Sequence, residues 1–366
     1  MASYKIVISG YYGFNNAGDE AMLLAIIQAL RKTFDVPDIT VISGNPTATS
    51  ETFGVDAVPR FGIWPIIKAL FHSDFLISGG GSLLQDVTSW KSMVYYLTII
   101  IVGVLFRKRV YLYSQGIGPV RYRVIRIILK HVLNYVDAIT VRDKESKGFL
   151  QRLGVHREIY TTADAVLSLE PSPLSLGKQI LEKNGIDSSR QLVGIAIRNW
   201  ADTSRWMESL KTCMDDLVSK EHCDVVLIPM QFPEDMVAAK AIGNNHSHIH
   251  ILQESYSIEE LISLMGNMDV VIGMRLHAMI FSALMHVPFL GISYDPKIDN
   301  FLALLHRKAS TSIKDMDGQA LYNDTCELLH HSFSQEEWEQ VDQLRKQACE
   351  NVEILETLVK QKEENK

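Results

Sequence analysis

Short apolar segments alternate with amphipathic stretches along the first half of the chain. The apolar segments are rich in β-branched and aromatic residues and are bounded by turn-forming residues, which is typical of strands. They cover residues 4–9, 38–43, 74–80, 109–116 and 138–143. Between the first two, apolar residues recur at helical spacing from Ala21 to Phe34. Strands separated by helical stretches predict a parallel sheet with crossover helices.

A second set of the same kind follows a change in composition near Glu170. The segment EPSPLSLGKQ is rich in Pro and Ser, and a polar stretch follows it, which is typical of an interdomain connection. Further strands are predicted at 192–198, 224–230, 248–252, 269–274 and 289–293. We therefore expect an N-terminal Rossmann-like domain (1–172), a linker (173–190) and a C-terminal Rossmann-like domain (191–332). Two such α/β domains facing a cleft form a GT-B-like fold.

The C-terminal segment, residues 333–366, predicts a long helix because it is rich in Glu, Gln, Lys and Leu. Ser334 is placed to cap its first turn, and Glu337 follows three residues later, which is the spacing of a capping box.

The run MVYYLTIIIVGVLF, residues 93–106, contains no charged residue and is followed by RKR at 107–109. It is too short to span a bilayer, which takes about 20 residues. A buried helix is the simpler interpretation. The alternative is a patch that lies on a membrane, with its basic flank touching anionic headgroups.

Composition and charge exclude several classes of function. The chain has 366 residues, of which 47% are hydrophobic and 22% charged, as in ordinary globular proteins. The formal charge of −7 argues against broad nucleic-acid binding, in which phosphate contacts dominate. The four cysteines form no CxxC pair, so reduced thiols are expected rather than a zinc site. No basic region followed by a long apolar core is present at the N-terminus, so we expect no signal peptide and a cytoplasmic protein.

Glycine-rich loops follow three of the predicted strands. The first, GYYGFNNAGDEA, carries Asn15, Asn16 and Asp19, whose amides and carboxylate could hydrogen-bond sugar hydroxyls or simply form the turn and the helix start. The second, ISGGGSLLQD, includes Gly80 and Gly81, which let a backbone approach a ligand closely. The third is YSQGIGPV. The first lacks the GK[ST] of a phosphate loop. We expect these loops to bind a polar acceptor.

Cationic side chains stand where predicted strands end. Arg198 and Arg142 each end an apolar strand, and each could instead pair with a protein carboxylate, such as Asp143 beside Arg142. Arg275 and His277 follow the strand at 269–274, and Lys297 follows the strand at 289–293. Ligands bind at the carboxyl ends of strands in open α/β sheets. Arginine suits carboxylate and phosphate, so we expect a small ligand that carries both groups.

Seven motifs occur in order along the chain: GYYGFNNAGDEAML, ISGGGSLLQD, YSQGIGPV, TVRDKES, ADAVLSL, IRNW and GMRLHAMIFSALMHVPFLGISYDPKI. Together they resemble the polysaccharide pyruvyltransferase family, in particular its bacterial CsaB-type members. The resemblance covers nearly everything from Tyr4 to about Phe301.

The resemblance implies transfer of a pyruvyl group from phosphoenolpyruvate to a sugar, with formation of a cyclic ketal. For CsaB-type members, the acceptor is a β-linked N-acetylmannosamine on a lipid-linked saccharide. The product is the 4,6-ketal on a secondary cell-wall polymer that anchors S-layer proteins. The family places donor binding at residues that correspond to Arg198, Arg275, Leu276 and His277, with Lys297 close by and Arg142 as a weaker match. A lipid-linked acceptor implies a peripheral contact with the inner face of the plasma membrane.

The chemistry fits these residues. Ketal formation needs a proton on the methylene carbon of the donor and the removal of protons from two sugar hydroxyls. We assign His277 as the catalytic acid–base group, since an imidazole exchanges protons near neutral pH. Arg198, with Arg275 and Lys297, would hold the donor and stabilise the departing phosphate. This scheme requires neither a metal nor an organic cofactor.

The main alternative is a GT-B glycosyltransferase that uses a nucleotide sugar. Such enzymes often carry a glutamate for the ribose diol seven residues before a proline that corresponds to Pro288, and Phe281 stands there instead. A non-enzymatic sugar-binding module is a second alternative, but a neutral glycan does not call for so many cations.

Overall fold

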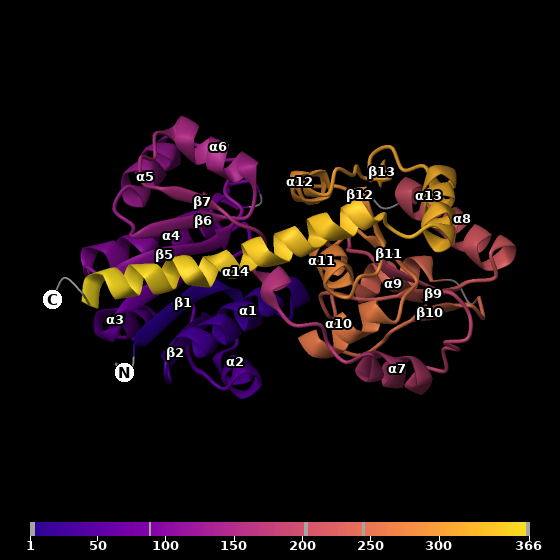
Figure 1. Ribbon diagram of the computed structural model, residues 1–366, viewed down its shortest axis with the longest axis horizontal. Coiled ribbons are helices and arrows are strands. Elements are labelled where there is room, and N and C mark those ends of the chain that lie inside the picture. The colour runs from indigo at the N-terminus through magenta and orange to yellow at the C-terminus, as the bar shows by residue number, and fades with distance from the viewer. Residues whose placement is uncertain (1–3, 88, 201–203, 244–245, 364–366) are drawn as a thin grey trace. The chain divides into compact units, whose positions relative to one another are not determined.

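The computed structural model describes residues 4–87, 89–200, 204–243 and 246–363, in which parallel strands alternate with helices (Figure 1). The chain divides into two compact units. The first unit contains the chain up to Asn15, residues 19–168 and the chain from Leu344 onwards. The second contains residues 16–18 and 169–343. Each unit is built on one parallel sheet, as the alternating pattern predicts.

The first unit has a seven-stranded sheet in the order β3-β2-β1-β4-β5-β6-β7, and every pairing is parallel. Its strands are β1 (Lys5–Tyr12), β2 (Asp38–Ser43), β3 (Asp56–Pro59), β4 (Phe75–Ser78), β5 (Arg109–Gln115), β6 (Ala138–Val141) and β7 (Ile159–Thr161). Five match predicted strands. The short strands β3 and β7 lie at the two edges and carry too few apolar residues to stand out in the sequence.

The helices of the first unit are α1 (Ala17–Thr33), α2 (Pro46–Phe53), α3 (Ile63–His72), α4 (Trp90–Leu105), α5 (Arg123–Leu133) and α6 (Lys144–Leu153), with a short 3-10 turn at Ala165–Ser168. Helices α3, α4 and α5 share one hydrophobic core with Val110 and Leu112 of β5 and with Ile139 of β6. Successive side chains of a strand point to opposite faces. These three helices therefore cover the same face of the sheet.

The C-terminal helix α14 (Gln335–Glu363) covers the other face of that sheet. Asn351 is buried on it and accepts hydrogen bonds from Thr140 Oγ1 (2.6 Å) and Thr162 Oγ1 (2.9 Å), while Tyr111 donates to its carbonyl (2.7 Å). The predicted capping box is present, because Glu337 N donates to Ser334 Oγ and Ser334 N donates to the Glu337 carboxylate.

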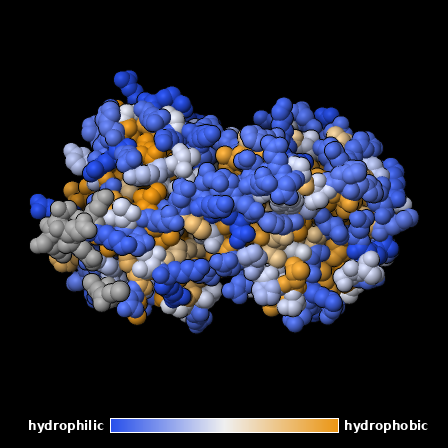
Figure 2. Space-filling view, viewed as in Figure 1, coloured by the Kyte–Doolittle hydropathy of each residue, from blue (hydrophilic) through white to orange (hydrophobic). Residues whose placement is uncertain are grey.

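The face of the molecule drawn in Figure 2 is mostly hydrophilic, with hydrophobic residues in small groups.

The apolar run at 93–106 forms most of α4, and one side of this helix is buried. Met93, Tyr96, Leu97, Ile99 and Ile100 are at most 4% exposed. Packing against the sheet therefore accounts for these five residues, whereas Val94 and Leu105 of the same run are 38% and 72% exposed. None of the described helices is long and apolar enough to cross a bilayer.

The second unit has a six-stranded parallel sheet in the order β10-β9-β8-β11-β12-β13. Its strands are β8 (Leu192–Ala196), β9 (Asp224–Leu227), β10 (Ile249–Ile251), β11 (Val270–Gly273), β12 (Phe289–Ser293) and β13 (Thr311–Ser312). Its helices are α7 (Leu174–Lys183), α8 (Ser204–Lys220), α9 (Met236–Ile242), α10 (Ile258–Gly266), α11 (Leu276–Leu284), α12 (Pro296–Leu304) and α13 (Gly318–His330). All but β13 match predicted strands.

The segment expected as a linker, 173–190, forms α7 and packs within the second unit. Gly177 N donates to Ser263 Oγ (2.7 Å), and the same hydroxyl donates to Pro173 O (2.6 Å). A Cβ added at Gly177 would lie 2.6 Å from Ser263 O, so glycine allows α7 to lie directly against α10. The polar composition of the segment reflects the exposed side of a helix.

Candidate functional site

The predicted cations of the second unit gather at the carboxyl edge of its sheet. The strand order reverses between β8 and β11, which are adjacent. Arg198 follows β8, Arg275 caps α11 directly after β11, and Lys297 lies in the first turn of α12 after β12. An open α/β sheet binds its ligands at this reversal. The arrangement of β8, β11 and β12 therefore brings three separate sequence motifs to one edge.

Arg275 is paired with a buried carboxylate. Its Nε donates to Asp235 Oδ2 (3.1 Å), a second nitrogen bonds Asp235 Oδ1, and the same nitrogen donates to Gln231 Oε1 (3.1 Å). Asp235 is fully buried and also accepts from the amides of Met230 (3.2 Å) and Gln231 (2.9 Å). The charge of Arg275 is thus compensated inside the protein.

Arg198 and Lys297 form a cation pair around Tyr294. Arg198 donates to the Tyr294 hydroxyl (3.0 Å), and its guanidinium lies 5.0 Å from the centre of that ring, with Lys297 Nζ at 5.4 Å. The ring of Trp200 lies 5.6 Å from the same guanidinium. Within the described parts of the chain, neither Arg198 nor Lys297 has a carboxylate at ion-pair distance. This leaves two positive charges uncompensated at the end of the sheet.

The two cations change the pKa of Tyr294. Burial would raise the pKa of the Tyr294 phenol, but the charges of Lys297 and Arg198 and the hydrogen bonds to both outweigh it. The net effect lowers that pKa from its usual value. A half-buried phenol with a lowered pKa requires a strongly positive environment, which is what an anionic ligand needs.

His277 lies in the first turn of α11, so Arg275 and His277 are not on one extended segment. The His277 ring lies against Gly18, where an added Cβ would stand 1.9 Å from Nδ1. The segment that carries Gly18 is fixed in this unit because Ala17 N donates to Met230 O (2.8 Å). The first amides of a helix have no partner within it and favour negative charge nearby. The start of α11 thus adds an imidazole and a helix dipole to the same edge.

Arg142 belongs to the first unit and is paired there. It donates to Asp164 Oδ2 (2.9 Å) and to Ser82 Oγ (3.1 Å), and the side chains of Arg142 and Asp164 are 8% and 4% exposed. The adjacent Asp143 instead caps α6 by accepting from Ser146 N (2.7 Å). The carboxylate that compensates Arg142 therefore lies 22 residues away in sequence rather than next to it.

The predicted acceptor-binding residues of the first unit divide into turn-forming and clustered ones. Asn15 has a positive φ of 54°, which is a turn geometry. Asn16, whose Oδ1 accepts from Gly18 N (3.1 Å), groups with the second unit. By contrast, Asp19 and Gly81 lie together at the β1–β4 edge, since a Cβ at Gly81 would stand 3.3 Å from Asp19 Oδ1.

Several polar residues at that edge were not predicted from the sequence. Glu20 accepts from the amides of Gly13 (2.8 Å) and Phe14 (3.3 Å), which holds the loop, and burial raises its pKa despite these bonds. Gln115 is fully buried and donates to Ser78 Oγ (2.7 Å), while its Oε1 has no hydrogen-bond partner among the described residues. Gln115 could have been predicted, because it is a polar residue at the end of an apolar strand.

Tyr294 of the second unit was also not predicted from the sequence. It could have been, because it directly follows a predicted strand and lies three residues before the predicted cation Lys297.

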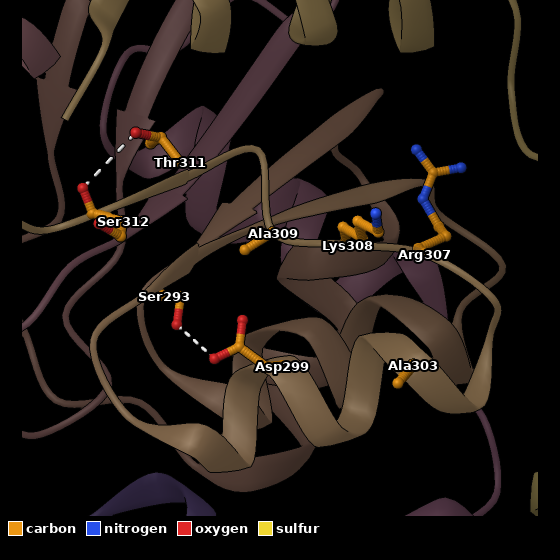
Figure 3. A pocket seen from close by; sticks show the side chains of 8 residues that line it. All are labelled: Ser293, Asp299, Ala303, Arg307, Lys308, Ala309, Thr311 and Ser312. Atoms are coloured by element: carbon orange, nitrogen blue, oxygen red, sulfur yellow. Dashed lines mark hydrogen bonds between the residues drawn. The ribbon is translucent and has the colours of Figure 1, made fainter. Parts of the chain in front are cut away.

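A separate pocket of about 480 Å³ opens beside β12 and β13 (Figure 3). Ser293 donates to Asp299 Oδ2 (2.6 Å) on one side, and Lys308 and Arg307 lie on the connection above it. Arg307 is paired with Glu337 (2.5 Å). Because Asp299 is negative and Arg307 is compensated, this pocket is less suited to an anion than the Arg198–Lys297 pair.

Comparison with known families gives a match over residues 16–296 to the polysaccharide pyruvyl transferase family. The chain belongs to this family. The match contains Arg198, Arg275 and His277 and ends at Pro296, one residue before Lys297. The polysaccharide pyruvyl transferases form a class of transferases, so the chain is a transferase of polysaccharide biosynthesis.

A curated relative of this pyruvyl transferase is the amylovoran biosynthesis protein AmsJ of Erwinia amylovora. It is 20% identical over 353 residues, which cover 80% of this chain and 84% of AmsJ. The match confirms the family at a distance. The CsaB-type subclass stays a prediction.

Solved structures establish the fold of the pyruvyl transferase. The UDP-GlcNAc 2-epimerase of Methanocaldococcus jannaschii superimposes with a TM-score of 0.70 at 12% identity, over 96% of this chain and 98% of the epimerase. The epimerase of Neisseria meningitidis gives 0.66 at 11% identity, over 97% and 100%. The E. coli ADP-heptose LPS heptosyltransferase II gives 0.51 at 16%, over 89% and 98%. These are GT-B-type folds, which confirms the predicted fold class.

Proposed function

We propose that this protein transfers a pyruvyl group from phosphoenolpyruvate to a sugar of a polysaccharide precursor. Two sugar hydroxyls bond to C2 of the donor, and the bond from C2 to the phosphate oxygen breaks. One of the two hydroxyl protons balances the proton that is added to the donor methylene, which becomes a methyl group. The other leaves with phosphate. The product is a cyclic ketal.

The Arg198–Lys297 pair carries the donor proposal. Phosphoenolpyruvate has a carboxylate and a phosphate, and the two cations around Tyr294 are the predicted ones that no described carboxylate compensates. Binding of the donor would replace water around two fixed charges by an anion without reorganising the protein. Leu276, the first residue of α11, would contribute the helix terminus rather than its buried side chain.

We assign Arg275 and Arg142 supporting roles. Each is bonded to a buried carboxylate, so direct donor binding would require sharing or breaking that pair. Arg275 instead fixes the loop before α9 through Asp235 and Gln231. This fixes the start of α11, where His277 stands as the proposed acid–base group.

For the acceptor, we propose a terminal β-N-acetylmannosamine on a lipid-linked cell-wall precursor, with ketal formation at O4 and O6. This rests on the resemblance to CsaB-type members. Asp19, Gly80 and Gly81 are the proposed contacts in the first unit, with Asn15 and Asn16 shaping the turn before α1. An enzyme acting on such an acceptor would work at the inner face of the plasma membrane.

Phosphate release tests the reaction. Purified protein would be incubated with phosphoenolpyruvate and a lipid- or aryl-linked N-acetylmannosaminyl acceptor, and phosphate measured over time. We expect acceptor-dependent release that falls about 10²–10⁴-fold in His277→Ala, which is the usual contribution of a general acid–base group. Release that survives in that variant would assign the proton transfer to another residue.

Donor binding is tested separately by thermal stabilisation. Phosphoenolpyruvate should raise the Tm of the wild type but not of Arg198→Gln or Lys297→Gln. Lys178→Gln is the matched control, because Lys178 is 58% exposed on α7. Stabilisation by a nucleotide sugar, with none by phosphoenolpyruvate, would contradict the proposal and favour a glycosyltransferase.

A further inference from the structure

The outward side of α3, α4 and α5 exposes an unusual amount of apolar surface. Of 16 large hydrophobic residues that are exposed in the described chain, 13 lie between Phe61 and Tyr135. They are Phe61, Ile63, Trp64, Phe71, Val87, Trp90, Val94, Leu105, Tyr122, Val124, Ile127, Ile128 and Tyr135. Trp64 is 80% exposed, and Ile63 is 70% exposed. Scattered exposed residues are ordinary, but a concentration of this kind marks an interaction surface.

The same part of the chain is strongly basic. Between Asp56 and Asp137 it carries ten Lys or Arg residues and two acidic ones, which gives a formal charge of +8. The remaining chain has 26 basic and 41 acidic residues, which gives −15 and accounts for the total of −7. The apolar residues are therefore exposed in a strongly cationic part of an acidic protein.

Both properties are found together on α5, although others of the ten cations, including Arg60 and Arg109, are half-buried elsewhere. Helices α3, α4 and α5 cover the same side of the sheet, opposite α14. On α5, Ile125 and Leu129 are buried against the sheet, while Arg123, Val124 and Arg126 point outward and are exposed. The sheet explains the buried side of the helix. It does not explain why apolar and basic residues alternate on the outer side.

We propose that the outer side of α3, α4 and α5 is a docking surface for an anionic lipid bilayer. We call it the α3–α5 surface. Exposed tryptophans suit the interface between headgroups and acyl chains, and long basic side chains keep their charge in the headgroup layer while their stems lie along apolar surface. Anionic headgroups complement the local excess of positive charge.

A protein partner fits this surface less well than a membrane. Protein interfaces place their apolar residues in a central cluster with a polar rim. Here the apolar residues extend from Phe61 before α3 to Tyr135 after α5, and cations are interspersed among them. A second copy of this chain would also bring a like-charged surface against it, which is unfavourable.

The α3–α5 surface is distinct from the apolar core of α4. The outward residues of α3, α4 and α5 would enter the headgroup layer, and from the run at 93–106 these include only Val94 and Leu105, whereas Met93, Tyr96 and Ile100 stay in the core. The inference does not depend on which donor or sugar the second unit binds, because none of the proposed donor or acceptor contacts lies on this surface.

Vesicle flotation tests the proposal directly. Full-length protein would be mixed with vesicles of phosphatidylcholine alone or with 30% phosphatidylglycerol and separated on a density gradient. We expect flotation only with the anionic vesicles, and less of it at 0.5 M salt, since salt screens the charges. No flotation with anionic vesicles at low salt would overturn the proposal.

Paired variants assign the binding to named residues. Each basic residue contributes about a fivefold change in membrane partition, so Arg123→Glu with Arg126→Glu should lower it at least about 25-fold. Lys178→Glu with Lys240→Glu changes the total charge equally in the second unit and should have little effect. Equal losses in both variants would overturn the proposal, because net charge rather than this surface would then control partition.

The apolar contribution is tested in the same way. Trp64→Ser should lower partition at constant charge, and Val237→Ser, at a residue 62% exposed in the second unit, should not. Unchanged phosphate release from a water-soluble acceptor shows that each variant is folded and keeps this test separate from the catalytic one. Self-association that Trp64→Ser abolishes, without vesicle binding, would identify a dimer interface and refute the proposal.

Discussion

Asp235→Asn provides a direct test of how Arg275 acts. The substitution keeps the shape of the side chain but removes the charge that compensates Arg275. Asp235 is fully buried, and the Arg275 side chain is 12% exposed. The variant therefore leaves a guanidinium nearly out of water with no carboxylate beside it.

The expected cost is large. Removing one partner of a buried ion pair destabilises a protein by about 3–5 kcal/mol, because the remaining charge is neither solvated nor paired. For a folding unit of this size, each kcal/mol lowers Tm by about 2–4 °C, so we expect a decrease of about 6–20 °C. Removing both charges in Arg275→Gln with Asp235→Asn should restore part of that loss.

Thermal unfolding and phosphoenolpyruvate titration would be measured on the same samples. If Arg275 only supports the site, Asp235→Asn lowers Tm strongly, and the folded protein still binds the donor within about threefold of the wild type. Glu182→Gln, which removes a carboxylate 62% exposed, should change stability by less than about 0.5 kcal/mol. An unchanged Tm with a tenfold or larger change in donor affinity would refute our reasoning and make Arg275 a direct donor ligand.

Three further predictions concern other parts of the molecule. The pKa of Tyr294 is lowered in the folded state. The stability of the wild type relative to Tyr294→Phe should therefore rise as the pH increases through that pKa, and this gain should be absent below it. Arg198→Gln should raise the pKa of Tyr294, as measured by absorbance titration at alkaline pH. Gly18→Ala places a Cβ 1.9 Å from His277 Nδ1, which would displace the imidazole. We expect about a 10²-fold loss of kcat without a comparable loss of donor affinity. An unchanged kcat would show that this contact is dispensable. Asn351→Ala removes the acceptor closest to the Thr140 and Thr162 hydroxyls and leaves only their longer bonds to Leu112 O (3.2 Å) and Val141 O (3.4 Å). This should cost about 1–3 kcal/mol in urea unfolding, whereas a cost below about 0.5 kcal/mol would mean that α14 contributes little here.

Local patterns in the sequence determined the fold class and named the residues of the candidate site. Ten of the thirteen strands in the described residues were predicted, because buried parallel strands are continuous apolar segments that stand out from amphipathic helices. The cations at strand ends were predicted for the same reason, since a charged residue directly after an apolar strand must lie at the edge of a sheet. The capping box of α14 was also predicted, because its two residues are close in sequence.

Only the tertiary structure decided which cations are paired. Arg142 meets Asp164, and Arg275 meets Asp235, across 22 and 40 residues, and no local pattern links such partners. The same folding brings Arg198 and Lys297 to one phenol and leaves them without a described carboxylate. It also buries one side of the apolar helix α4 and exposes the mixed surfaces of α3 and α5. Charge compensation and exposure depend on contacts between distant segments, so the sequence names the candidate residues and the packing of the strands decides their roles.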